Sequence, residues 1–247
     1  MKTMIGVMGS VSGYDERARD LTYRLGESIA RHGCAIVTGA CPGLPHEAVR
    51  GAKATGGLTV GVSPGHNFAE HTIKYDSPWE GYDIIIYTGS GLMGREITGV
   101  RSCDIVVLAG GRSGTLGEFS IAYDEGKLIG VLKGTGGIAE HVSMLVDVIH
   151  KDTGAQVVYG DDPEHLIATL VQMDAARKTA DRKQFPLALN AQPIDPTLTT
   201  SLEGTQRAIA IMEMEVRRIQ ANLAEQHRRL EAYRDLALMG SGERGKG

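Results

Sequence analysis

The stretch from Gly110 to Glu118 reads Gly-Gly-Arg-Ser-Gly-Thr-Leu-Gly-Glu and has the composition of a phosphate-binding loop. It follows an apolar run and opens a helical pattern, where the first backbone N–H groups lack partners and carry partial positive charge. Glycines let a phosphate approach these groups, and hydroxyls add further donors. We therefore predict a nucleotide phosphate site made by Gly110, Gly111, Arg112, Ser113, Gly114 and Thr115. For a lone loop, a tight turn with a Ser/Thr cap explains the pattern equally well.

Arg95 and Glu118 could perform chemistry beside this loop, because they flank the same predicted strand in sequence. An arginine offers a cation to phosphate or sugar oxygens, and a glutamate offers a carboxylate to an electron-deficient carbon. Cleavage of an N-glycosidic bond passes through such an oxocarbenium-like centre while water attacks. Taken by themselves, the two residues are better explained as an exposed salt bridge.

Short apolar runs alternate with helical patterns up to about residue 180. The runs predicted as strands are 4–8, 34–37, 58–62, 84–87, 105–108, 128–132 and 156–159. The patterns predicted as helices are 15–31, 45–55, 92–101, 115–124, 138–150 and 163–173. Such alternation with wholly apolar strands predicts an α/β fold, a doubly wound, Rossmann-like parallel sheet buried on both faces.

Ligands of such sheets bind outside the carboxyl ends of the strands, where the strand order reverses. Five predicted loops at this edge are rich in glycine and small hydroxyl residues. Besides the loop at 110–115, they include Gly9 and Ser10 after the first strand and Gly39 and Gly43 after the second. We expect these loops to share one continuous ligand cleft.

The residues from Gly110 to Glu118 resemble the P-G-G-x-G-T-x-x-E signature of the Lonely Guy (LOG) phosphoribohydrolases, and the similarity runs without gaps from Arg95. Residues 38–44, TGACPGL, resemble the family's G-G-G-x-x-G-L loop. The likeness covers about residues 4–172 and is greatest to the bacterial and archaeal branch that begins I-G-V-x-G-S, which includes a molybdenum-cofactor carrier protein. Within the signature, Gly110 and Arg112 replace a proline and a glycine.

The resemblance implies cleavage of a nucleoside 5′-monophosphate to a free base and ribose 5-phosphate, without a metal or other cofactor. It implies Arg95 and Glu118 as the catalytic pair and the loop at 111–115 as the phosphate site. The alternative is a nucleotide or cofactor sensor or carrier of the same fold that turns nothing over.

The composition favours a cytoplasmic protein, and the loop at 110–115 favours a small phosphorylated ligand. The net charge of −4 argues against nucleic acid or an anionic membrane as a partner. Three separated cysteines fit a reducing compartment. His66 and His71 lie in a long segment that we expect to cover the cleft, and we interpret them as surface side chains rather than metal ligands.

The C-terminal part of the chain has a different pattern. Residues 181–200 hold three prolines and few charges, which predicts a linker after a domain of residues 1–180. Residues 201–240 carry apolar side chains on a seven-residue repeat, which predicts one long helix with a coiled-coil seam. Pairing with another chain is favoured over packing on its own domain, so we expect a homo-oligomer, a dimer or larger.

Overall fold

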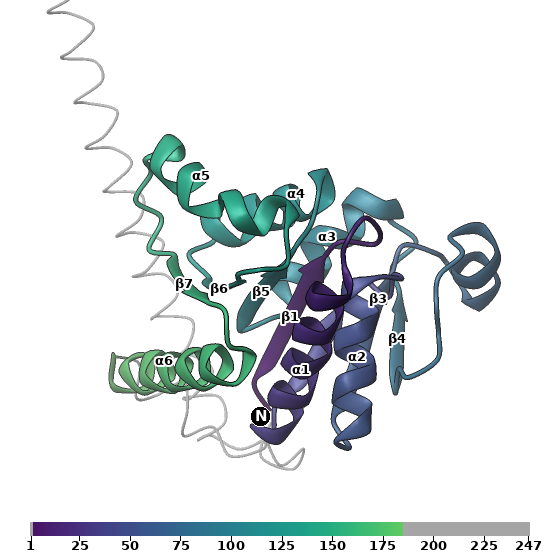
Figure 1. Ribbon diagram of the computed structural model, residues 1–247, viewed down its shortest axis with the longest axis horizontal. Helices are drawn as coiled ribbons and strands as arrows, with labels where there is room; N and C mark the ends of the chain where they lie inside the picture. Colours follow the sequence, from purple (N-terminus) through teal and green to yellow (C-terminus); the bar gives the residue numbers. More distant parts are fainter. Residues whose placement is uncertain (1, 185–247) are drawn as a thin grey trace, which may run out of the picture. The chain divides into compact units, whose positions relative to one another are not determined.

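The computed structural model describes residues 2–184, with side chains through residue 180. Its centre is a seven-stranded, wholly parallel sheet of order β4-β3-β2-β1-β5-β6-β7 (Figure 1). The strands are β1 (Met4–Gly9), β2 (Ala35–Thr38), β3 (Leu58–Ser63), β4 (Ile84–Tyr87), β5 (Ile105–Ala109), β6 (Leu128–Leu132) and β7 (Gln156–Gly160).

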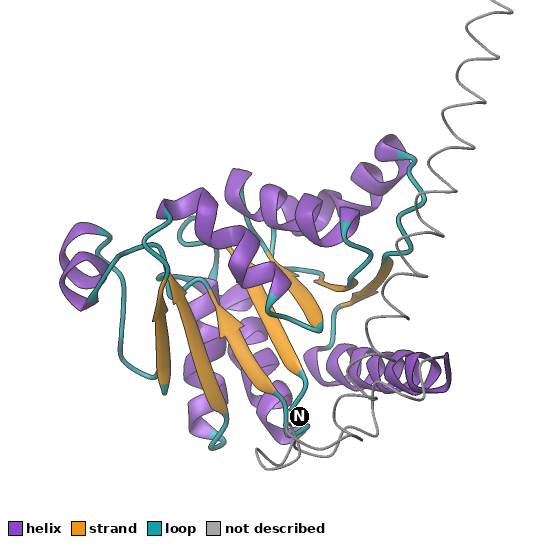
Figure 2. Ribbon diagram, turned by 180° about the vertical axis from the view of Figure 1, so that it is seen from behind, coloured by secondary structure: helices purple, strands orange, loops and turns teal. Residues whose placement is uncertain are grey.

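Helices cover both faces of the sheet (Figures 1 and 2). They are α1 (Glu16–Arg31), α2 (Leu44–Ala54), α3 (Gly91–Arg101), α4 (Ser113–Asp124), α5 (Val142–Ile149) and α6 (Pro163–Gln184). Apolar side chains of α1, α2 and α6 pack on one face, and those of α3, α4 and α5 pack on the other, which gives two separate hydrophobic cores. The predicted doubly wound α/β fold is therefore confirmed.

The strand order reverses between β1 and β5, which are hydrogen-bonded neighbours in the sheet. The chain leaves β1 toward β2 on one side and leaves β5 toward β6 on the other. Their carboxyl ends, Gly9 and Ala109, stand in register. A Cβ atom on Gly9 would lie 2.3 Å from the Ala109 carbonyl oxygen, so the close pairing requires glycine there.

The predicted elements agree closely with the observed ones, and the differences are local. The helix predicted at 138–150 begins as a 3-10 turn, Gly137–His141, and only then continues as α5. The helix predicted at 163–173 continues to Gln184, four residues into the segment expected to be a linker. The remainder of that segment and the predicted coiled-coil helix at 201–240 lie outside the described residues.

Met1–Arg177 form one compact unit, and Lys178–Gly247 are assigned to a second unit of which only the end of α6 is described. Among the described residues, no helix is both long enough and apolar enough to cross a membrane.

The connection between β3 and β4 contains only a short π-helix, Glu70–Lys74. The prediction that His71 is a surface side chain is wrong, because it is fully buried. Its Nδ1 lies 3.0 Å from the Ser63 hydroxyl and its Nε2 lies 3.0 Å from the Pro78 carbonyl oxygen. The imidazole thus ties the connecting segment to the end of β3, while His66 is exposed as expected.

Candidate functional site

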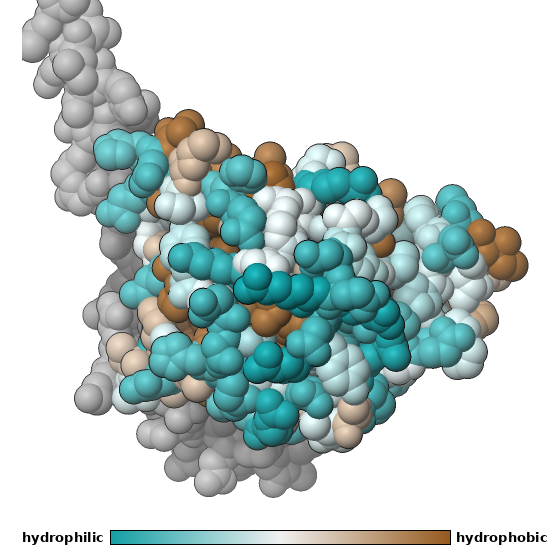
Figure 3. Space-filling model, viewed as in Figure 1, coloured by the Kyte–Doolittle hydropathy of each residue, from teal (hydrophilic) through white to brown (hydrophobic). Residues whose placement is uncertain are grey.

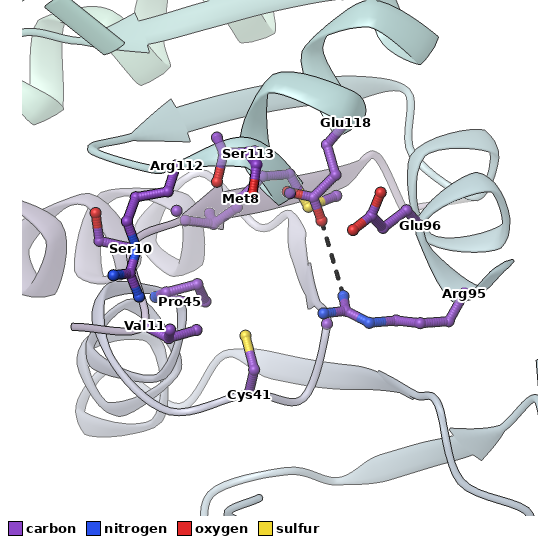
Figure 4. A pocket seen from close by; sticks show the side chains of 15 residues that line it. Met8, Ser10, Val11, Cys41, Pro45, Arg95, Glu96, Arg112, Ser113 and Glu118 are labelled. Carbon is purple, nitrogen blue, oxygen red and sulfur yellow. Dashed lines mark ion pairs between the residues drawn. The ribbon is translucent and has the colours of Figure 1, made fainter. Parts of the chain in front are cut away.

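A cavity lies at the reversal of strand order, at the carboxyl ends of β1, β2 and β5 (Figure 4). Its lining comes from the end of β1, from the loops after these strands and from α2, α3 and α4. Nine of the twelve predicted site residues line it: Gly9, Ser10, Gly39, Arg95, Arg112, Ser113, Gly114, Thr115 and Glu118. The structure therefore brings together loops that are up to about a hundred residues apart in sequence.

Gly110 and Gly111 shape the cavity, but their amides are already used inside the protein. The Gly110 N–H donates to the Thr135 hydroxyl over 2.8 Å, and the Gly111 N–H donates to the Ser10 hydroxyl over 2.6 Å. Both glycines have positive φ angles, 64° and 101°. Both N–H groups thus already have acceptors and neither residue lines the cavity, so the prediction that Gly110 and Gly111 belong to the phosphate site would rest on the close approach that glycine permits, and it stays a prediction.

The N-terminus of α4 lines the cavity. Within the described part of the chain, no side chain caps this helix, and its first residues are Ser113, Gly114 and Thr115. The first amides of a helix have no acceptor inside the helix. Arg112 precedes them and donates from Nη2 to the Ser12 hydroxyl over 3.0 Å, which places its guanidinium beside the loop after β1 (Figure 4). This end of the cavity offers donors and positive charge to an anion.

Arg95 of α3 and Glu118 of α4 form the other end of the cavity. Arg95 Nη1 lies 3.7 Å from Glu118 Oε1, and the two residues are only 9% and 6% exposed. The interpretation as an exposed salt bridge is therefore wrong. Among residues 2–184, Arg95 Nε is buried and has no hydrogen-bond partner. Burial raises the pKa of Glu118 to about 7, while Arg95 opposes the rise and Glu96 adds to it.

Gly39 makes room for Arg95. A Cβ atom on Gly39 would overlap the Arg95 guanidinium, at 1.6 Å from Nη1. The loop that carries Gly39 is fixed by Thr38, whose hydroxyl accepts from the Ala40 N–H over 3.1 Å and lies 2.7 Å from the Tyr82 hydroxyl. The lack of a side chain at Gly39 therefore lets the Arg95 guanidinium pack against the loop after β2.

Gly43 lies outside the cavity lining and positions the loop after β1. Its φ is 86°, and a Cβ atom there would lie 2.3 Å from the Ser10 carbonyl oxygen. That same oxygen accepts from the Leu44 N–H at the start of α2 over 2.8 Å. Gly43 therefore lets α2 hold the chain at Ser10.

Two polar residues of the cavity were missed from the sequence, Cys41 and Glu96. Burial raises the pKa of the Cys41 thiol, with Arg95 acting against the rise. Glu96 is half-buried and follows Arg95 on α3, and burial also raises the pKa of its carboxyl. Its position next to Arg95 in the predicted helix at 92–101 was the available signal.

Among the residues that the structure describes, no three His, Cys, Asp or Glu side chains come together as a potential metal site.

Comparisons with known proteins agree with this fold. An uncharacterised protein of Archaeoglobus fulgidus is 37% identical over 134 residues, which cover 54% of this chain and 82% of the relative. The molybdenum cofactor binding protein of Rippkaea orientalis is 29% identical with a TM-score of 0.59, covering 70% of this chain and 98% of that one.

The molybdenum cofactor carrier protein of Chlamydomonas reinhardtii is 30% identical with a TM-score of 0.58, covering 71% of this chain and 99% of that one. The resemblance to LOG-like Rossmann-fold proteins is therefore confirmed. A model of the SLOG cluster4 family matches residues 2–167, and the chain belongs to that family.

Proposed function

We propose that the cavity binds a nucleoside 5′-monophosphate and hydrolyses its N-glycosidic bond to a free base and ribose 5-phosphate. The observation that carries this proposal is the placement of the buried Arg95–Glu118 pair in the same cavity as the uncapped N-terminus of α4. One end offers donors to a phosphate, and the other offers a carboxylate to a sugar carbon.

In this proposal the phosphate lies against the first amides of α4, at Ser113, Gly114 and Thr115. Helix N-termini bind anions because their N–H groups are unpaired and the helix dipole is positive there. Arg112 adds a charged, exposed donor at the same end. Gly110 and Gly111 serve as a rigid support whose own amides are bonded to Thr135 and Ser10.

The reaction requires that water add to C1′ while the C1′–N bond breaks and the base leaves with a proton. As the bond breaks, positive charge develops at C1′ and the ring oxygen. An ionised Glu118 stabilises that charge, and its burial strengthens the effect because few waters screen it. Arg95 orients Glu118 and offers its buried Nε to a ligand oxygen.

The assay is incubation of the purified full chain with AMP, GMP, CMP and UMP, with free base and ribose 5-phosphate quantified by chromatography. The proposal predicts stoichiometric release of both products from at least one nucleotide. Binding without release would contradict hydrolysis and leave the second candidate function.

That second candidate is a carrier of a nucleotide or phosphorylated cofactor without turnover, favoured by the names of the two similar structures. The donors at the α4 N-terminus and the two arginines, Arg95 and Arg112, fit the phosphate of such a cofactor. Mass spectrometry of ligands released from the purified protein tests this candidate. A stoichiometric phosphorylated cofactor, with no hydrolysis of nucleotides, would favour the carrier.

We also propose a homo-oligomer formed through exposed apolar side chains of α3 and of the edge strand β4. Leu92, Met93 and Ile97 of α3 are 58%, 80% and 42% exposed, and Ile84 and Ile86 of β4 are about as exposed. Figure 3 shows exposed apolar residues gathered at separate places, including the region of α5. On α5 they are Met144, Val148 and Ile149, and Ile73 is exposed in the β3–β4 connection. Soluble monomers rarely expose a large contiguous apolar surface.

A charge on this surface tests the oligomer. Met93→Lys places an ammonium where an apolar contact is expected, and we expect light scattering to show a smaller assembly than for the unaltered chain. Met144→Lys, on α5, is a matched control at another exposed methionine and should leave the mass unchanged. Equal masses for all three proteins would contradict an interface on α3.

A further inference from the structure

Glu96 lies against the first turns of α4, where two glycines make room for it. A Cβ atom on Gly114 would lie 3.3 Å from Glu96 Oε1, and one on Gly117 would lie 3.2 Å from Oε2. The two glycines are three residues apart and therefore share one face of the helix. The carboxylate of Glu96 is thus seated beside the N-terminal part of α4, on the side that faces α3.

The Glu96 carboxylate is a negative charge of the protein itself that lies beside the N-terminus of α4. The N-terminus of a helix carries about half a positive charge, and negative side chains near it are stabilised. In Figure 4 Glu96 points from α3 toward the cavity and lies next to Glu118. Two carboxylates therefore share this end of the cavity with Arg95, while Arg112 stands at the opposite end.

We propose that Glu96 is a specificity-determining residue that keeps a second phosphate group out of the cavity. The proposal rests on the proposed function, in which one phosphate already occupies the amides of Ser113, Gly114 and Thr115. That phosphate accepts hydrogen bonds from these amides and offsets most of the partial positive charge at the N-terminus of α4. A second phosphate group that extended from these amides toward α3 would lie within reach of Glu96 and Glu118, where it meets like charge.

Coulomb's law and the exposure of Glu96 together set how much its charge weakens the binding of a second phosphate group. Glu96 is half-buried, so its charge is screened less than at an open surface and more than in a core. At about 4 Å, one unit of like charge weakens binding by about 5-fold with the screening of bulk water and by more with the weaker screening of a half-buried site, and the effect falls as the distance grows. The penalty grows with the charge of the ligand, so it acts on diphosphates more strongly than on monophosphates.

Calorimetric titration at pH 8 with four probes tests the proposal: inorganic phosphate, pyrophosphate, AMP and ADP. Each is titrated into the full chain and into three variants, Glu96→Gln, Glu96→Asp and Glu125→Gln. Glu125 is a control because it follows α4 at its other end, where it pairs with Arg101 over 2.7 Å. Its change removes the same charge far from the cavity.

We expect Glu96→Gln to raise the affinity for ADP relative to AMP, and for pyrophosphate relative to phosphate, by about 3-fold or more. Glu96→Asp and Glu125→Gln should keep the ratios of the unaltered chain. Ratios in Glu96→Gln within 2-fold of the unaltered chain, or an equal rise in Glu125→Gln, would overturn the proposal.

The same titrations separate this inference from the proposed function. If the unaltered chain binds no nucleotide but Glu96→Gln gains affinity for pyrophosphate relative to phosphate, the proposed function fails and the role of Glu96 stands. If neither protein binds any probe, both are contradicted. If the unaltered chain binds ADP as tightly as AMP, the proposed function stands and the role of Glu96 fails.

Discussion

The two ends of the cavity differ in how their polar groups are satisfied. At the loop after β5, the amides of Gly110 and Gly111 are bonded to the Thr135 and Ser10 hydroxyls. At the end formed by α3 and α4, Arg95 Nε has no partner among the described residues, and Glu118 meets Arg95 only at 3.7 Å.

This difference indicates which residues hold the shape of the site and which ones meet the ligand. A buried polar group that is fully bonded fixes the backbone around it, whereas a buried polar group without partners costs stability, and one that lines a cavity can be satisfied by a ligand. The comparison assigns the loop at Gly110 and Gly111 to holding the shape of the site. It assigns Arg95 and Glu118, together with the α4 amides, to the ligand.

The largest expected effect is on turnover in Glu118→Gln. The change keeps the shape of the side chain and removes the charge that stabilises the transition state, so kcat should fall by about 100-fold or more, while AMP affinity changes little. Steady-state kinetics and calorimetry measure the two quantities. Equal turnover in the variant and the unaltered chain would remove Glu118 from the mechanism.

The raised pKa of Glu118 also predicts two pH dependences. Turnover should rise as pH increases through about 7, because the ionised carboxylate is the active form. Folding stability should change in the opposite sense. As pH rises from 4.5, the usual pKa of a glutamate, the unfolded state loses this proton while the folded state keeps it, so the free energy of unfolding falls until pH passes about 7. The melting temperature of Glu118→Gln relative to the unaltered chain should therefore increase between pH 4.5 and pH 8. A constant difference would contradict a raised pKa.

A slightly smaller effect on turnover is expected when Arg95 is kept in the sequence but pushed out of its position. In Gly39→Ala the new methyl group would overlap the guanidinium, so Arg95 must move away from Glu118, and we expect AMP turnover to fall by about 10- to 100-fold. Gly99→Ala is the matched control, because its Cβ would meet nothing within 4 Å on the same helix as Arg95. Similar losses in both variants would show that the geometry at Gly39 is not the cause.

The smallest effect tests the supporting end. Ser10→Ala leaves the buried Gly111 N–H without its acceptor, and we expect the free energy of unfolding to fall by about 1–3 kcal/mol. Ser12→Ala removes an exposed contact with Arg112 and should change stability by about 0.5 kcal/mol or less. Denaturant unfolding of both variants measures the difference. Equal stabilities would contradict the assignment of Ser10 as a structural support.

Most of the fold could be predicted from the sequence, because apolar strands and their spacing are local signals. The bounds of β4 and β6 agree residue for residue with the runs predicted at 84–87 and 128–132. The burial of His71 could not be predicted, since its two partners, Ser63 and Pro78, meet it only after the β3–β4 connection folds back. A histidine in a long polar segment gives no local sign of this.

The site was predicted in outline, and the errors concern long-range partners. Arg95, Glu118 and the start of α4 were expected in one cleft, and they line one cavity. The acceptors for Gly110 and Gly111 come from Thr135 and Ser10, which lie 25 and 101 residues away, so no loop pattern reveals them. Glu96 was missed because its seat depends on Gly114 and Gly117 of a neighbouring helix.

A crystal structure of the full chain with AMP, using Glu118→Gln to prevent turnover, tests the central claim most directly. The account predicts phosphate density within hydrogen-bond distance of the Ser113, Gly114 and Thr115 amides, with C1′ of the ribose beside residue 118. Density for AMP elsewhere on the molecule, or with the base at the α4 N-terminus and the phosphate beside residue 118, would contradict it.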